Sequence, residues 1–233
     1  MINTDFNIYG FVMLISFLSG ILIIIKNCYD KEYNVNEIVT LVIYLFIGFI
    51  LGGKIYSYFS GNYEKFEFMK LGLSSLGSLI GAFIVLIIYK FQFNKKIEEL
   101  LYILLPSVVI MYAIGKIGCF FTGCCLGLKY TGLGNIVYHY SNHVTSDYSY
   151  FPIQIIESII FFIVFIYLFV IKRNKDYNVF KITINCFWIK FILDFFRLNH
   201  EVKLISFNQI TCLVCIILIY LFLALKSRKS LHK

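Results

Sequence analysis

The amino-acid sequence predicts an all-α polytopic membrane protein with seven transmembrane helices, an N-terminus outside the cell and a cytoplasmic C-terminus. Mean hydropathy is +0.81, and 60% of the 233 residues are hydrophobic while only 15% are charged. Such a composition is typical of membrane proteins. The distribution of Lys and Arg between the apolar stretches predicts the orientation. We expect one membrane domain over residues 1–233.

Seven apolar stretches cover the chain, each near the roughly 20 residues that a helix needs to cross a bilayer core. They comprise residues 6–25, 38–59, 71–89, 100–118, 152–171, 179–196 and 205–225. The first stretch follows an acidic residue, Asp5, and no small-residue cleavage site comes after it. We therefore expect a retained helix and no signal peptide.

Basic residues are unevenly divided between the two sides of this arrangement. Thirteen of the 21 Lys and Arg residues lie after the first, third, fifth and seventh stretches. Cytoplasmic loops carry such an excess, so the C-terminal tail is predicted inside and the outer loop 119–150 outside. The formal net charge is +8, but it is spread over short connections. We expect the membrane as partner and no nucleic acid.

A glycine-rich segment, residues 115–127, ends the fourth stretch and reads G-K-I-G-C-F-F-T-G-C-C-L-G. Glycine lets a backbone turn tightly and approach a ligand closely. Lys116 adds a cation, and Cys119, Cys124 and Cys125 add three thiols. This segment is a candidate active-site loop; the alternative is a helix exit in which small residues fill gaps. The seven cysteines show no zinc or disulfide spacing, so no metal and no cofactor are expected.

Small residues recur four apart in the third stretch, at Ser74 and Ser78 and at Gly77 and Gly81. The second stretch repeats this spacing at Gly48 and Gly52. Small residues at such spacing allow close helix contacts in membranes. Helix packing is therefore the simplest interpretation of the pattern.

Charged residues inside the sixth stretch require an explanation, because a charge at bilayer depth costs roughly 2.5–3.5 kcal/mol. Lys190, Asp194 and Arg197 are spaced to share one helical face. Gln154 and Glu157 share a face of the fifth stretch, at the same outer level as Lys116. These groups predict a cationic outer-leaflet cavity for an anionic phospholipid headgroup. The alternative is a set of structural ion pairs and snorkelling side chains.

Seven short motifs, in order, resemble the prolipoprotein diacylglyceryl transferase family. The resemblance rests on Tyr9-Gly10, G-G-K-I at 52–55, the small-residue run at 72–81, the segment 115–127, F-P-I-Q at 151–154 with Glu157, the charges from Lys190 to Arg197, and Ser206 with Gln209. Each motif is weak alone, but together they span nearly the whole chain.

This resemblance implies a seven-helix enzyme of the bacterial cytoplasmic membrane. Such enzymes move a diacylglyceryl group from phosphatidylglycerol to the thiol of a lipobox cysteine and release glycerol phosphate, without metal or organic cofactor. The implied catalytic residues are Lys116, Cys119, Cys124, Lys190, Asp194 and Arg197. The implied lipid-binding residues are Tyr9, Lys54, Gly77, Gly127, Gln154 and Glu157.

The chain also departs from the family pattern. Leu76 stands at the family's histidine, Ser78 at a glycine, Cys119 at an asparagine and Cys124 at a glutamate, and lysine replaces arginine at positions 54, 116 and 190. Two other functions are therefore considered. One is a non-catalytic lipid-binding or transport protein; the other is a membrane thiol oxidoreductase that uses Cys124-Cys125 with Cys212-x-x-Cys215.

The thiols stand where the family has polar groups. In a catalytic protein we expect Cys119 or Cys124 to take part directly, by orienting the acceptor or as a nucleophile, since a thiolate is strongly nucleophilic. His139 and His143 are the nearest candidates in sequence for a base. The alternative is that the cysteines only fill small spaces.

Overall fold

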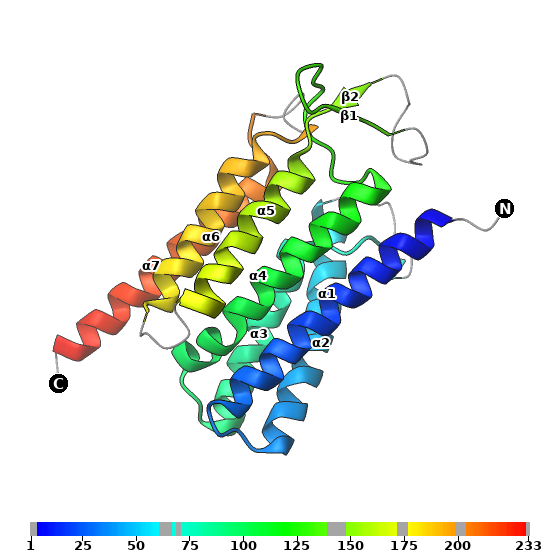
Figure 1. Cartoon of the computed structure of the whole chain (residues 1–233). Helices are drawn as coiled ribbons and strands as arrows, with labels where there is room; N and C mark the ends of the chain where they lie inside the picture. Colours follow the sequence, from blue (N-terminus) through cyan, green and yellow to red (C-terminus); the bar gives the residue numbers. More distant parts are fainter. Residues whose placement is uncertain are drawn as a thin grey trace. The chain divides into compact units, whose positions relative to one another are not determined.

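The computed structural model describes residues 4–60, 67–68, 71–138, 148–171, 177–198 and 204–231. Its elements, in chain order, are α1 (Thr4–Tyr29), α2 (Val35–Ser60), α3 (Ser75–Phe93), α4 (Ile97–Thr122), β1 (Ile136–Val137), β2 (Ser149–Tyr150), α5 (Ile153–Ile166), the π-helical turn η1 (Tyr167–Ile171), α6 (Val179–Asp194) and α7 (Phe207–Leu231) (Figure 1). The predicted all-α class is confirmed, because the only strands among these residues are β1 and β2, which have two residues each and form one pair.

Six of the described helices are long and apolar enough to cross a membrane, so the chain is a multi-pass membrane protein. They are α1 to α4, α5 continued into η1, and α7. Helix α6 has 16 residues and is shorter than a typical span. The number of seven spans and their orientation remain predictions.

The fourth helix is longer than the sequence predicted. Its apolar stretch was expected to end at residue 118, with the outer loop beginning at 119, but α4 continues to Thr122. Cys119 therefore lies on a helix and not in a loop. The apolar residues Phe120 and Phe121 account for the extra turn, since nothing before Gly123 stops the helix. Residues 139–147 of the predicted loop, with His139 and His143, lie outside the described residues.

The chain forms two compact units. The first contains Met1–Ser16 and Ala113–Lys233, and the second contains Phe17–Tyr112. In the second unit, α2 and α3 pack side by side through the glycines that the sequence singled out. A Cβ atom on Gly52 would overlap backbone atoms of Gly77 and Gly81, and one on Gly81 would overlap the carbonyl of Gly48. The predicted close packing of small residues is confirmed.

Replacing Gly81 with valine should destabilise this contact, because the obstacle is helix backbone that cannot move aside. Overpacking costs about 1–3 kcal/mol, and we expect a value at the upper end. The matched control is Gly10→Val in α1, where a new Cβ meets nothing within 4 Å and the change in helix propensity is the same. Thermal unfolding in detergent measures the difference; equal shifts in the midpoint would contradict the packing role.

In the first unit, α5, α6 and α7 lie next to one another, and the strands β1 and β2 stand in the connection between α4 and α5 (Figure 1). The strands are antiparallel, with Ile136 opposite Tyr150. Backbone hydrogen bonds also tie the segment after α4 to distant parts of this unit. The N–H of Leu128 donates to the carbonyl of Phe196 at 3.0 Å, and the N–H of Phe151 donates to the carbonyl of Leu128 at 2.9 Å.

Candidate active site

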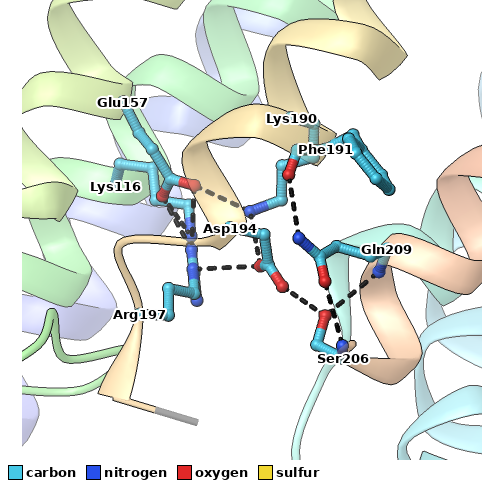
Figure 2. A network of polar contacts seen from close by, with 8 residues as sticks. All are labelled: Lys116, Glu157, Lys190, Phe191, Asp194, Arg197, Ser206 and Gln209. Carbon is cyan, nitrogen blue, oxygen red and sulfur yellow. Dashed lines mark hydrogen bonds and ion pairs between the residues drawn. The ribbon is translucent and has the colours of Figure 1, made fainter. Parts of the chain in front are cut away.

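Five charged side chains, which we call the ionic cluster, meet inside the first unit (Figure 2). They are Lys116 near the end of α4, Glu157 on α5, Lys190 and Asp194 on α6, and Arg197 three residues after the end of α6. All five are buried, with at most 7% of the residue surface exposed. The sequence predicted that these groups converge, and the structure brings them together.

Glu157 is the centre of the cluster, and no part of it is exposed. The Nζ of Lys190 donates to Oε1 at 2.7 Å, and the Nζ of Lys116 lies 3.0 Å from Oε2. The Nη2 of Arg197 donates to Oε2 at 2.7 Å and to Oε1 at 3.0 Å. One carboxylate therefore holds three cations from three different chain segments.

Asp194, the last residue of α6, contacts two of the same cations, Lys190 and Arg197. Its Oδ1 lies 3.3 Å from Nε of Arg197 and 3.6 Å from Nζ of Lys190, and its Oδ2 accepts a hydrogen bond from the hydroxyl of Ser206. Three cations and two carboxylates leave one net positive charge in a buried place. Buried charges persist only when paired and hydrogen-bonded, so each member depends on the others.

Ser206 and Gln209 extend this network to α7 and begin that helix as a capping box (Figure 2). The N–H of Gln209 donates to Oγ of Ser206 at 3.1 Å, and the N–H of Ser206 donates to the Gln209 side chain at 3.0 Å. Gln209 also donates to the carbonyl of Phe191 on α6 at 3.2 Å. The S-x-x-Q pattern before an apolar stretch indicates such a cap in the sequence. It does not indicate the hydrogen bond from Ser206 to Asp194.

Gly127 holds the backbone around Arg197. It pairs with Arg197 in an antiparallel bridge, and a Cβ on Gly127 would overlap the carbonyl of Phe151. Glycine is therefore required here for close approach of two chain segments. Gly127 thus lies between Phe151, just before α5, and the segment that carries Arg197.

The three thiols of the glycine-rich segment also lie together. The sulfur atoms of Cys119, Cys124 and Cys125 are within 4.8 Å of one another, an arrangement that the sequence analysis did not predict. The Gln154 side chain donates to the carbonyl of Cys124 at 2.9 Å. Hydrogen bonds from Cys119 and Cys124 hold the pKa of the Cys125 thiol well below its usual range, and the charges of Lys116 and Arg197 lower this pKa further.

The remaining predicted site residues, Tyr9, Lys54 and Gly77, belong to other helices. The Tyr9 ring packs against Gly118 of α4, where a new Cβ would be 3.4 Å from the ring. Lys54 and Gly77 belong to the second unit. Lys54 donates to the carbonyl of Leu71 at 2.6 Å, Gly77 packs against α2, and Leu76 is buried.

Comparison with known proteins agrees with the motifs. The family model described as prolipoprotein diacylglyceryl transferase matches residues 1–225. A phosphatidylglycerol–prolipoprotein diacylglyceryl transferase of Clostridium tetani is 28% identical over 235 residues, which are 95% of this chain and 94% of the relative. A second enzyme of this name, from Clostridium perfringens, is 25% identical over 95% of this chain and 93% of its own length.

A shorter match points the same way. A phosphatidylglycerol–prolipoprotein diacylglyceryl transferase of Dehalococcoides mccartyi is 30% identical over 166 residues, which are 68% of this chain and 63% of the relative. The family match covers nearly the whole chain, and the ordered motifs and buried ionic cluster are consistent with it. This chain belongs to the prolipoprotein diacylglyceryl transferase family.

Proposed function

We propose that this protein transfers a diacylglyceryl group from phosphatidylglycerol to the thiol of a lipobox cysteine. In this reaction the acceptor sulfur, as thiolate, forms a bond to the terminal glyceryl carbon of the diacylglyceryl group. The bond between that carbon and the phosphate oxygen breaks, and glycerol phosphate leaves with the electron pair. The products are a thioether and a phosphate monoester. Family membership, together with a buried cluster of net positive charge, supports this proposal.

The ionic cluster suits the leaving group of this reaction. Negative charge grows on the phosphate as the carbon–oxygen bond breaks, and cations fixed in advance stabilise that charge without reorganising. We assign this role to Lys116, Lys190 and Arg197. Glu157 and Asp194 hold the three cations in position before the lipid binds, and the excess of one positive charge favours an anionic headgroup.

We assign the other predicted residues supporting roles. Tyr9, Lys54 and Gly77 remain proposed lipid-site positions. Gln154 and Gly127 shape the backbone near the cluster, through the Cys124 carbonyl and the Arg197 segment. Cys119 and Cys124 remain candidates for orienting the acceptor thiol.

The proposed setting is the bacterial cytoplasmic membrane, with one seven-span domain, an outer N-terminus, a cytoplasmic C-terminus and no nucleic-acid partner. Single cysteines at Leu133, which is 99% exposed, and at the exposed Ser227 test the orientation. They are placed in a chain whose seven native cysteines are all replaced by serine. An impermeant maleimide should label position 133 in intact cells and position 227 only after lysis. The reverse pattern would overturn the orientation.

Direct assay of the purified protein tests the reaction. Phosphatidylglycerol labelled in the diacylglyceryl group is incubated with a lipobox peptide, and the same peptide with serine in place of cysteine is the control. The expected result is label on the cysteine peptide alone, with an equal amount of glycerol phosphate released. Saturable phosphatidylglycerol binding without either product would instead support a lipid-binding protein. Exchange of thiols with a quinone would support an oxidoreductase.

A further inference from the structure

The three thiols at the end of α4 form a compact group that the proposed reaction does not explain. Cys119 lies in the last turn of the helix, and the chain then reverses so that Cys124 and Cys125 return toward it. The N–H of Cys124 donates to the carbonyl of Cys119 at 3.1 Å, and Gly123 adopts a φ of 64°. All three sulfur atoms lie within 4.8 Å of one another.

The backbone of this turn is unusual at Cys125, whose φ is 56°. The left-handed region costs about 1–2 kcal/mol for a residue with a Cβ, and glycine or asparagine normally occupies it. Strained conformations of this kind persist where the surrounding structure fixes them and often belong to functional sites. Cys125, the strained residue, supplies one of the three thiols of the group.

Three thiolates are the ligands that a thiophilic cation prefers. Zn²⁺ binds cysteine sulfur at about 2.3 Å in tetrahedral geometry, so its sulfur ligands lie roughly 3.8 Å apart. The three sulfur atoms lie within 4.8 Å of one another. Side-chain rotations that move each sulfur by about an ångström would therefore bring them to the spacing of zinc ligands. Three protein ligands leave the fourth tetrahedral position to water or to another thiolate.

The surroundings also suit the charge of such a site. Zn²⁺ with three thiolates carries one net negative charge. Lys116 lies one helical turn before Cys119 on α4, and it belongs to the ionic cluster, which has one net positive charge. The net negative charge of the metal site and the net positive charge of the ionic cluster are opposite in sign and attract each other.

Hydrogen bonds hold the ligands in place. The hydroxyl of Thr122 donates to the sulfur of Cys124 at 3.4 Å, and the Gln154 side chain fixes the Cys124 carbonyl. Groups that hydrogen-bond a metal ligand orient it and tune its affinity. Both donors are partly or fully buried, which protects these bonds from water.

We propose that Cys119, Cys124 and Cys125 form a three-thiolate binding site for a thiophilic d¹⁰ cation, with Zn²⁺ as the natural class of ligand. Binding releases the protons that the thiols still carry and gives a site with one exchangeable position. The test of this site is independent of the proposed transfer reaction, because it measures metal affinity and not turnover.

Cadmium and zinc titrations of the reduced full-length protein in detergent test this proposal. Cd²⁺ bound to thiolates gives a sulfur-to-metal absorption band in the ultraviolet whose intensity follows the number of sulfurs. The wild type should bind one Cd²⁺ with the intensity of three thiolates, and Zn²⁺ should displace it. Serine at position 119, 124 or 125 should weaken binding by more than about a hundredfold, since losing even a group that only supports a ligand costs 10–100-fold.

Cys215→Ser in α7 is the matched control, because Cys215 is a free thiol outside the group. It should leave the cadmium band unchanged. Circular dichroism of every variant confirms that the helices are formed, and three separate serine variants keep the test decisive if one of them unfolds. No band in the reduced wild type, or a band that survives all three substitutions, overturns the proposal. If the wild type shows the cadmium band but no transfer activity, that result contradicts the proposed reaction and leaves the metal site standing.

Discussion

Replacing Glu157 with glutamine will destabilise the protein by about 3–5 kcal/mol, the usual cost of breaking a buried ion pair by removing one partner. The reason is that three cations lose their common counter-charge. Asp194 would then be the one carboxylate left in the cluster, and the net charge of the cluster would rise from +1 to +2. Denaturation of the purified protein in detergent, followed by circular dichroism, measures this loss.

Glu37→Gln is the matched control for that substitution. Glu37 forms an ion pair with Lys95 at 2.9 Å, but 16% and 22% of the two side chains remain exposed. Partly exposed pairs contribute little, and we expect a loss below about 1 kcal/mol. Similar losses in the two variants would mean that burial does not set the cost, and the account of the ionic cluster would fail.

Replacing Arg197 with alanine will lower the rate of diacylglyceryl transfer by about 10²–10³-fold, the range for removing one preorganised charge-stabilising group. Arg197→Lys is the more informative variant. The guanidinium reaches Glu157 with Nη2 and Asp194 with Nε, whereas a lysine offers one nitrogen and lacks this fork of separate donors. Loss of one hydrogen bond to a charged group is worth about 1.5–3 kcal/mol, so we expect a rate roughly tenfold or more below wild type.

Arg228→Lys is the control for Arg197→Lys, because Arg228 is exposed near the end of α7. Initial rates should stay at the wild-type level in that variant. Unfolding midpoints of all variants separate lost catalysis from lost folding. A full rate in Arg197→Lys would show that a point charge is enough at this position and would contradict the bridging role.

Much of the fold could be predicted from local pattern alone. Apolar stretches of span length predicted each helix to within a few residues, since helix formation in a bilayer depends on length and hydropathy. Four-residue spacing predicted close helix packing at Gly48 and Gly52 and at Gly77 and Gly81, although not that these two pairs contact each other. Spacing on one helical face likewise predicted that Lys190 and Asp194 lie together. It was wrong for Arg197, which joins them from beyond the end of α6 at Asp194.

Features that depend on distant segments could not be predicted in this way. The sequence gives no reason for Gly127 to pair with Arg197, because 70 residues separate them and the pairing follows from tertiary structure. The thiol group depends on where α4 ends and on the left-handed conformation of Cys125. Glycine is the residue usually found in that conformation, so local sequence rules do not predict it for a cysteine.

The glycine contact between α2 and α3 has a consequence for biosynthesis. Its four glycines, Gly48, Gly52, Gly77 and Gly81, all lie within about 35 residues of one another and within one unit. Chains fold in the order in which they are made, and helices in a bilayer first insert and then associate. The two helices can therefore dock as soon as α3 enters the membrane, before any member of the ionic cluster has entered it. Assembly of this hairpin is thus a nucleating step that needs no buried charge to be neutralised.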